Sequence, residues 1–269
     1  MMTTLAILGA GKMGETLLSG LLRSGTPPSE VIVSVRRAER AKALEEKYGV
    51  CAVGSADAAE RGATVLLAVK PQDMNALLLE IRHAITPDKL VVSMAAGIPT
   101  TTIERQLAEG VAVVRVMTNT PALVDEAMSV LSAGSHADEA HLSRAEEVFR
   151  HVGKVLRVPE YQQDAVTALS GSGPAYFFYL VEAMIDAGIL LGLPRAVAAD
   201  LLVQTAVGAA VMLRDTGEHP VRLREAVTSP AGTTINAIRE LEKHGVRAAF
   251  LAAIEAARDR SRELAEGHE

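Results

Sequence analysis

Short apolar runs alternate with longer amphipathic stretches through the first half of the chain. The runs are rich in Val, Leu and Ile, which predicts buried strands, and the stretches between them have helical spacing. Strand, helix, strand in this order predicts a mostly parallel, doubly wound sheet with helices on both faces. The expected strands are Leu5–Leu8, Val31–Val35, Val65–Val69, Leu90–Met94, Val111–Val116, Ala127–Ala133 and Lys154–Val158, and the expected helices are Met13–Leu22, Ala38–Tyr48, Gln72–Ile85, Thr101–Leu107 and Asp138–His151.

The strand pattern stops after Val158. From Ala165 onward the chain is rich in Ala, Leu, Val and Met at helical spacing, with breaks at clusters such as Ser170–Pro174. A chain of 269 residues exceeds the usual size of one core. The sequence therefore predicts two domains, an α/β domain over residues 1–158 and an all-α domain over residues 159–269.

Two stretches of the second half are apolar enough to be considered as membrane spans. Pro174–Leu193 carries Glu182 and Asp186, and Ala196–Leu213 carries Asp200. Carboxylates at the centre of a span are costly in a bilayer. We therefore expect helices buried in protein and no membrane partner.

Composition narrows the function classes. The formal net charge is -6 with no long basic run, which disfavours nucleic-acid binding. The single cysteine, Cys51, excludes an internal disulfide framework, and the residues Met1–Leu8 do not resemble a signal peptide, so we expect a cytoplasmic location. The seven histidines are scattered without a metal-binding spacing, so we expect no metal site.

A glycine motif directly follows the first expected strand and opens a helix. Its residues are Gly9, Ala10, Gly11, Lys12, Met13 and Gly14, which match G-x-G-x-x-G. In this context the glycines permit a tight turn, a close approach to a pyrophosphate, and close packing of helix on strand. The pattern predicts a Rossmann-type dinucleotide site with the phosphates at the helix N-terminus. The alternative is a turn with incidental glycines.

The end of the second expected strand bears on the choice of cofactor. An NAD site usually places an acid there to bind the ribose 2′-hydroxyl, but here Ser34 is followed by Arg36 and Arg37. A serine hydroxyl and two guanidinium groups favour a 2′-phosphate, so the sequence predicts NADPH, with NADH as an alternative. The competing interpretation is a solvated basic turn.

Three further loops follow expected strands and should face the cofactor, because ligands bind at the carboxyl ends of strands in such sheets. Lys70 is equally well explained as a solvated loop lysine. The candidate residues in these loops are Ala68, Val69, Lys70 and Pro71 in the first, Ala95 and Gly97 in the second, and Asn119 in the third.

The segment Thr228–Thr234 packs hydroxyl side chains, a proline and a glycine before a helix-like run. Such a loop can turn several N–H groups toward one carboxylate without any Arg or Lys. An ordinary capped turn is an equally good interpretation of the segment by itself, because Ser and Thr are common N-cap residues.

Taken together, these segments resemble the pyrroline-5-carboxylate reductase family. The glycine motif, Ala68–Gln72, Met117–Pro121, Ala168–Tyr176 and Val227–Thr234 occur in the family's order, and the resemblance extends from about Ala6 to Leu251. The sequence departs from the family's usual residue at three places. Lys12 replaces Asn, Ala231 replaces Gly, and Ser55 stands where some members carry an Asn near the cofactor ribose.

The resemblance implies NAD(P)H-dependent reduction of 1-pyrroline-5-carboxylate to L-proline, the last step of proline biosynthesis. It implies a homodimer through the C-terminal helices, with the substrate site at the dimer interface facing the nicotinamide, and further assembly as a ring of dimers. Thr234 would contact the ring nitrogen. The residues implied in substrate binding are Ser229, Ala231, Gly232, Thr233 and Thr234.

Such a reaction needs no strong catalytic base. A protonated iminium already carries its proton, so the main task is to hold the imine carbon against the hydride donor. This agrees with a loop that contains hydroxyls but no acid or histidine. The alternatives are a reductase for a six-membered ring analogue or a keto acid, and a catalytically silent dinucleotide-sensing protein.

Overall fold

The computed structural model describes residues 4–266. The chain divides into two compact units, one formed by the described residues up to Ser172 together with those from Ala257 onward, and the other by Gly173–Ala256. The predicted division after residue 158 coincides with the end of the last strand, whereas the first unit continues through a short helical segment. As a functional division it stays a prediction.

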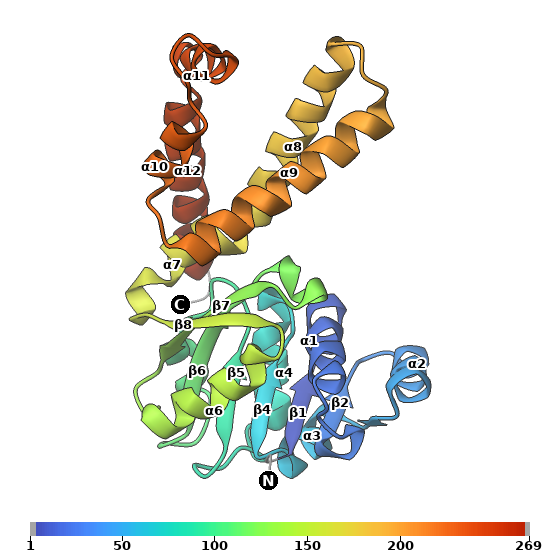
Figure 1. The fold of residues 1–269 in the computed structure, drawn as a ribbon. Coiled ribbons are helices and arrows are strands. Elements are labelled where there is room, and N and C mark those ends of the chain that lie inside the picture. Colours follow the sequence, from blue (N-terminus) through green and yellow to red (C-terminus); the bar gives the residue numbers. More distant parts are fainter. Residues whose placement is uncertain (1–3, 267–269) are drawn as a thin grey trace. The chain divides into compact units, whose positions relative to one another are not determined.

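The first unit is built on one eight-stranded sheet with the strand order β3-β2-β1-β4-β5-β6-β7-β8 (Figure 1). Every neighbouring pair is parallel except β6 and β7, which are antiparallel. The mostly parallel, doubly wound sheet predicted from the sequence is thus confirmed. The strands are β1 Leu5–Leu8, β2 Val31–Ser34, β3 Cys51–Ala52, β4 Thr64–Leu67, β5 Leu90–Ser93, β6 Ala112–Met117, β7 Ala127–Ala133 and β8 Gly153–Arg157.

Both faces of this sheet are covered, because alternate strand residues point to opposite sides. Leu5 and Ile7 of β1 belong to one buried cluster with residues of α1, α2 and α6, and Ala6 and Leu8 belong to a second with residues of α3, α4 and α5. The helices are α1 Lys12–Arg23, α2 Ala38–Tyr48, α3 Ser55–Arg61, α4 Met74–Ile81, α5 Thr100–Glu104, α6 Glu139–Arg150 and α7 Gln163–Val166.

Two details of the predicted elements were wrong. The strand β3 and the helix α3 were missed, because a two-residue strand followed by Gly54 gives no periodicity to detect. The expected helix Gln72–Ile85 is a 3₁₀ turn, η2 Pro71–Asp73, followed by α4, which ends at Ile81. Proline fixes its own backbone and cannot donate to a helical ladder, which suits the first turn only.

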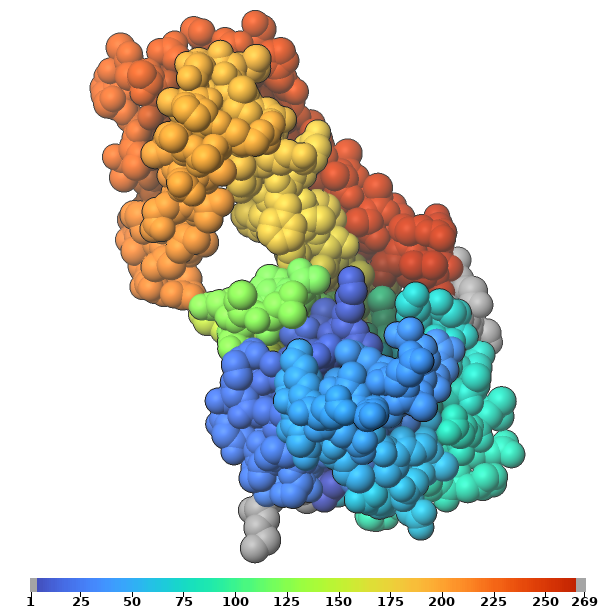
Figure 2. Space-filling view, turned by 90° about the vertical axis from the view of Figure 1, so that its right-hand side faces the viewer, coloured from blue at the N-terminus to red at the C-terminus, as the bar shows by residue number. Residues whose placement is uncertain are grey.

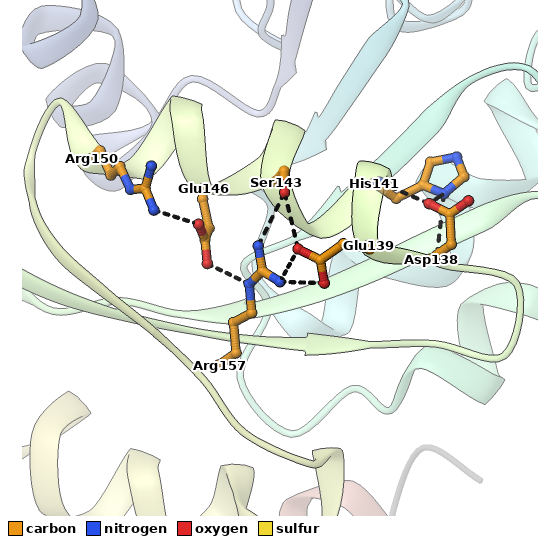
Figure 3. A network of polar contacts seen from close by, with 7 residues as sticks. All are labelled: Asp138, Glu139, His141, Ser143, Glu146, Arg150 and Arg157. Carbon is orange, nitrogen blue, oxygen red and sulfur yellow. Dashed lines mark hydrogen bonds and ion pairs between the residues drawn. The ribbon is translucent and has the colours of Figure 1, made fainter.

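A polar network attaches α6 to β8 at one end of the sheet (Figure 3). The guanidinium of Arg157 donates to both oxygens of Glu139 at 2.6 and 2.7 Å and also to Glu146. Glu146 is only 10% exposed in its side chain and accepts a second bond from Arg150 at 2.6 Å. Asp138 caps the helix through the backbone N–H of His141. A carboxylate this deeply buried is retained because two arginines compensate its charge.

The second unit is helical. It contains α8 Gly173–Leu190, α9 Arg195–Thr216, α10 Pro220–Ala226 and α11 Thr233–Lys243, and α12 Val246–Glu266 begins in it. The predicted break at Ser170–Pro174 is instead a π-helical turn, Thr167–Gly171, in which the N–H of Ser172 donates to the carbonyl of Thr167. The helix pair α8 and α9 packs closely enough that a Cβ on Gly188 would lie 2.9 Å from Ala198 Cβ.

Many apolar side chains of this helical unit are uncovered in the single chain. Phe177, Tyr179 and Leu190 are 69%, 75% and 89% exposed. By length and composition, Glu160–Leu190 and Arg195–Thr216 are long and apolar enough to cross a membrane. The sequence led us to expect that these two helices are buried in protein, but within a single chain many of their apolar side chains are exposed.

Candidate functional site

A cavity of about 570 Å³ lies in the first unit, where β1, β2 and β4 end. The three strands are neighbours and parallel, so the loops that follow them meet at one edge of the sheet. In the space-filling view the blue to cyan part of the chain, which carries these loops and α1 to α4, forms one continuous face of the unit (Figure 2). The lining residues are Gly9, Ala10, Gly11, Ser34, Val35, Arg36, Arg37, Arg40, Ser55, Ala68, Val69, Lys70, Asp73, Ala76, Leu77 and Glu80.

The first three residues of the glycine motif, Gly9, Ala10 and Gly11, line this cavity. Gly9 has φ +87°, and a Cβ on it would lie 2.5 Å from Val69 Cγ1 and 3.0 Å from the carbonyl oxygen of Ala68. Gly14 packs similarly, with a Cβ position 3.1 Å from the carbonyl oxygen of Gly9. Around Gly11, by contrast, the nearest atom to a Cβ would be 3.9 Å away. Gly9 and Gly14 therefore serve packing, while Gly11 leaves its backbone open to a ligand.

The N-terminus of α1 suits an anion. Its N-cap is Gly11, which has no side chain to accept from the first N–H groups of the helix. These groups point out of the helix end and carry the positive end of its dipole. A pyrophosphate placed on Gly11 would satisfy them, so the residues present fit a dinucleotide.

The residues at the end of β2, Ser34 to Arg37, form another wall of the cavity. Ser34 is buried and its hydroxyl donates to Ser55 Oγ at 3.2 Å, which brings the first residue of α3 to the cavity. Arg36 forms an ion pair with Asp73, while Arg37 is exposed and its guanidinium has no partner among residues 4–266. The end of β2 carries no acidic residue, and the assignment of Ser34, Arg36 and Arg37 to a 2′-phosphate stays a prediction.

Arg40 is the functional candidate that sequence reasoning missed. It lines the cavity from the first turn of α2 because the helix begins at Ala38 and turns this residue back toward α1. Its guanidinium pairs with Glu15, which also accepts from Lys47 Nζ at 3.1 Å and from Tyr48 Oη at 3.0 Å. Burial pushes the pKa of Glu15 upward, but these three hydrogen bonds outweigh it and lower the pKa to about 2.

Only some of the other predicted cofactor residues line this cavity. Ala68, Val69 and Lys70 line it. Lys12 and Met13 line another cavity of about 570 Å³, whose walls come from α1, the end of α2 and the 3₁₀ turn η3 Thr120–Val124. Pro71 begins η2, Ala95 is buried, and Gly97 has φ +71°. The roles of these residues in cofactor binding stay predictions.

The side chain of Asn119 is already used within the protein. Its amide nitrogen donates to the carbonyl of Ser170 at 3.1 Å, and its oxygen accepts from the N–H of Met128 at 3.1 Å. Asn119 thereby ties the end of β6 to the start of β7 and to the π-helical turn. The cofactor contact predicted for this residue stays a prediction, and its side chain already has a structural role.

The segment Thr228–Thr234 lies in the second unit and consists of a tight turn followed by the first two residues of α11. Gly232 is the N-cap and makes no side-chain cap, and the loop closes through a bond from its N–H to the carbonyl of Ser229 at 3.1 Å. A Cβ on Gly232 would lie 2.4 Å from Ser229 Oγ. The N–H groups of Thr233 and Thr234 thus begin a helix of eleven residues without a capping side chain, as an anion-binding loop requires.

Ala231 has the left-handed backbone that normally selects glycine. Its φ is +57°, and Asp125 is the other non-glycine residue with positive φ in the described part of the chain. The carboxylate of Asp125 pairs with Arg23, whereas the methyl group of an alanine can make no polar contact, and this conformation costs about 1–2 kcal/mol. Backbone strain of this kind collects at binding and catalytic sites. Alanine at position 231, where the family usually has glycine, therefore keeps the backbone of the turn but adds strain to the loop.

Comparison with known proteins identifies the fold and the family. Residues 160–264 match the family model described as pyrroline-5-carboxylate reductase dimerisation, and residues 4–97 match that of the coenzyme F420-dependent NADP oxidoreductases. The chain is 45% identical to the pyrroline-5-carboxylate reductase of Corynebacterium melassecola over 98% of its own length and 99% of the relative. This chain belongs to the pyrroline-5-carboxylate reductase family.

Solved structures of other pyrroline-5-carboxylate reductases share this architecture. The Coxiella burnetii protein matches with a TM-score of 0.93 at 36% identity, covering 98% of this chain and 99% of that one. The Plasmodium falciparum protein, crystallised with NADP bound, matches with a TM-score of 0.88 at 25% identity, covering 98% of each chain. The resemblance read from the sequence is thus confirmed, and the cavity of the first unit lies within the part that matches NADP oxidoreductases.

The ion-pair cluster at Glu15 predicts a specific dependence of stability on pH. The pKa of Glu15 is lowered from 4.5 to about 2, so its stabilisation is fully present above pH 4.5 and is lost as the pH falls toward 2. We expect Glu15→Gln to lower the free energy of unfolding at pH 7 by about 1 kcal/mol, since the hydrogen bonds are charge-assisted but partly exposed.

The measurement is urea unfolding of both proteins at pH 7, 4.5 and 3, at one fixed protein concentration. The difference between variant and parent should shrink as the pH falls. A difference that stays constant over this range would show that the carboxylate charge contributes nothing to stability.

Proposed function

We propose that this chain reduces the C=N bond of 1-pyrroline-5-carboxylate to form L-proline, with NADPH as hydride donor, in the cytoplasm and as the last step of proline biosynthesis. The observation that carries the activity is the similarity to pyrroline-5-carboxylate reductases along nearly the full length of both chains. A dinucleotide cavity in the first unit and an uncapped anion loop in the second are the two sites that such a reaction needs. The reducing cytoplasm suits a chain whose single cysteine, Cys51, is free and exposed.

The preference for NADPH is proposed from the wall at the end of β2. Ser34 offers a hydroxyl, and the guanidinium groups of Arg36, Arg37 and Arg40 line the same cavity. Charge-assisted bonds from arginine favour a phosphate over a hydroxyl. The bound dinucleotide supplies hydride chemistry, and the residues of this chain hold it by Gly11, by the N-terminus of α1 and by this basic wall.

The substrate is proposed to bind at the loop Thr228–Thr234. Its carboxylate would accept from the free N–H groups at the start of α11, where the helix dipole adds to the attraction. The hydroxyl of Thr234 has no hydrogen-bond partner among residues 4–266 and is half-buried, which leaves it available to the ring nitrogen. Threonine is a weak acid, so its task is to orient the imine, which already carries its proton.

One assay tests the activity directly. Oxidation of NADPH is followed with 1-pyrroline-5-carboxylate and, in parallel, with its six-membered ring analogue. The five-membered substrate should be turned over with the higher kcat/KM. Preference for the six-membered ring would replace the proposed substrate, and inactivity with both would reject the proposed function.

The first prediction concerns the 2′-phosphate. Replacing Arg36 and Arg37 together by Gln should raise the KM for NADPH far more than the KM for NADH, since each charge-assisted phosphate contact is worth about 1.5–3 kcal/mol. The measurement is steady-state kinetics with both cofactors at saturating imine. Equal changes for NADPH and NADH would show that these arginines do not contact the 2′-phosphate.

The second prediction concerns Thr234. Thr234→Ala should lower kcat/KM for the imine by at least about tenfold, the equivalent of roughly 1.4 kcal/mol for one hydrogen bond. Thr234→Ser, which keeps the hydroxyl, and Thr233→Ala should both stay close to the parent. The Kd for NADPH should not change, because the cofactor cavity is built from other residues. Unchanged kinetics in Thr234→Ala would mean that the imine is held elsewhere.

The third prediction concerns assembly. We propose a homodimer through the C-terminal helices, assembling further as a ring of dimers, because the helical unit leaves so much apolar surface uncovered. Light scattering at low micromolar concentration should show no monomer. The double variant Val203→Asp and Val207→Asp, which charges one exposed face of α9, should dissociate the assembly, whereas Leu79→Asp on α4 should not. A stable and active monomer of the parent chain would contradict this assembly.

A further inference from the structure

Two carboxylates already hold arginines of the cofactor cavity. Arg36 follows β2, and Asp73 closes η2 after β4, so the two residues come from loops on either side of β1. Their ion pair joins these loops beside the glycine motif, which follows β1 and lines the same cavity.

The geometry of this pair is that of a two-pronged guanidinium–carboxylate contact. Arg36 Nη1 lies 3.0 Å from Asp73 Oδ1, and Nη2 lies 3.3 Å from Oδ2. The Arg36 side chain is 84% exposed and that of Asp73 is 29% exposed. The contact uses one N–H of each Nη and offsets the guanidinium charge, so a phosphate must replace the carboxylate or share the arginine with it through the remaining N–H groups. Its exposure keeps it weak enough to be exchanged.

The other two arginines of the cavity differ from Arg36 in their partners. Arg40 is held by Glu15, whose remaining acceptors are taken by Lys47 and Tyr48. Arg37 has no partner among residues 4–266. Of the three arginines that line the cavity, Arg37 can therefore meet an incoming anion with its whole charge, whereas Arg36 must leave Asp73 or share its charge with it.

We propose that Asp73 is a specificity-determining residue that limits the preference for 2′-phosphorylated dinucleotides. The proposal rests on the proposed dinucleotide site. A 2′-phosphate must displace Asp73 from Arg36 or share the arginine with it, and in either case it lies near the Asp73 charge, whereas a ribose 2′-hydroxyl meets neither cost. Asp73 thus reduces the advantage of NADPH over NADH and leaves NADH usable.

The test removes the carboxylate charge by Asp73→Asn and measures binding with probes that lack the nicotinamide. Adenosine 2′,5′-bisphosphate carries the 2′-phosphate, and adenosine 5′-monophosphate does not. In titration calorimetry, Asp73→Asn should bind the bisphosphate about three- to tenfold more tightly and the monophosphate nearly unchanged, as expected from releasing one partly exposed ion pair. The ratio of kcat/KM for NADPH to that for NADH should rise by a similar factor.

Glu80→Gln is the matched control. Glu80 is an exposed carboxylate that lines the same cavity and has no ion-pair partner in the described part of the chain. It should leave the bisphosphate to monophosphate ratio within about twofold of the parent, since an exposed, unpaired charge is strongly screened. In an Arg36→Gln background, Asp73→Asn should lose most of its effect, because the arginine that it releases is gone.

Three outcomes would overturn the proposal. The first is an unchanged ratio in Asp73→Asn. The second is weaker bisphosphate binding, which would make Asp73 a positioning partner of Arg36. The third is an equal rise of the bisphosphate preference in Glu80→Gln, which would show that the effect comes from the general negative charge of the cavity and not from the Arg36–Asp73 pair. Because the probes report binding without turnover, failure of the proposed reaction would not be mistaken for failure of this inference.

Discussion

The close approach of β1 and β4 at Gly9 is the constraint on which the cofactor site depends. The chain turns out of β1 with φ +87° in a space where even one methyl group would overlap Val69 and Ala68. This turn directs the chain straight into α1, so the helix begins at Lys12 with the open backbone of Gly11 in front of it. A bulkier or straighter connection would move the helix end away from the strand edge, and the anion site would lose its donors.

Around this fixed point the charges are balanced rather than simply basic. Three arginines line the cavity, and two of them are held by Glu15 and Asp73. The carboxylates hold the guanidinium groups through ion pairs before a ligand arrives. They also compete with that ligand. An arginine cluster in an NADPH site is therefore not a measure of phosphate affinity until its internal partners are counted.

The sequence predicted most of the scaffold because the strands are buried on both faces and read as short continuous apolar runs. β1 and β7 have the predicted bounds, and the glycine motif lies where it should. Arg40 and Asp73 could not be predicted in the same way. Whether a charged side chain lines a cavity depends on the rotation of a short helix or turn relative to the sheet, and exposed charged positions look alike in a sequence.

The same limit explains the second unit. Helical spacing identified its helices, but α8 and α9 are apolar on so many sides that periodicity could not say what covers them. Ala231 illustrates the point at the level of one residue. The sequence showed alanine where the family usually has glycine, but only the backbone reveals that the alanine adopts the glycine conformation, with φ +57°. The loop is therefore kept by the packing of Gly232 against Ser229 and by the start of α11, not by the intrinsic preference of the residue at its turn.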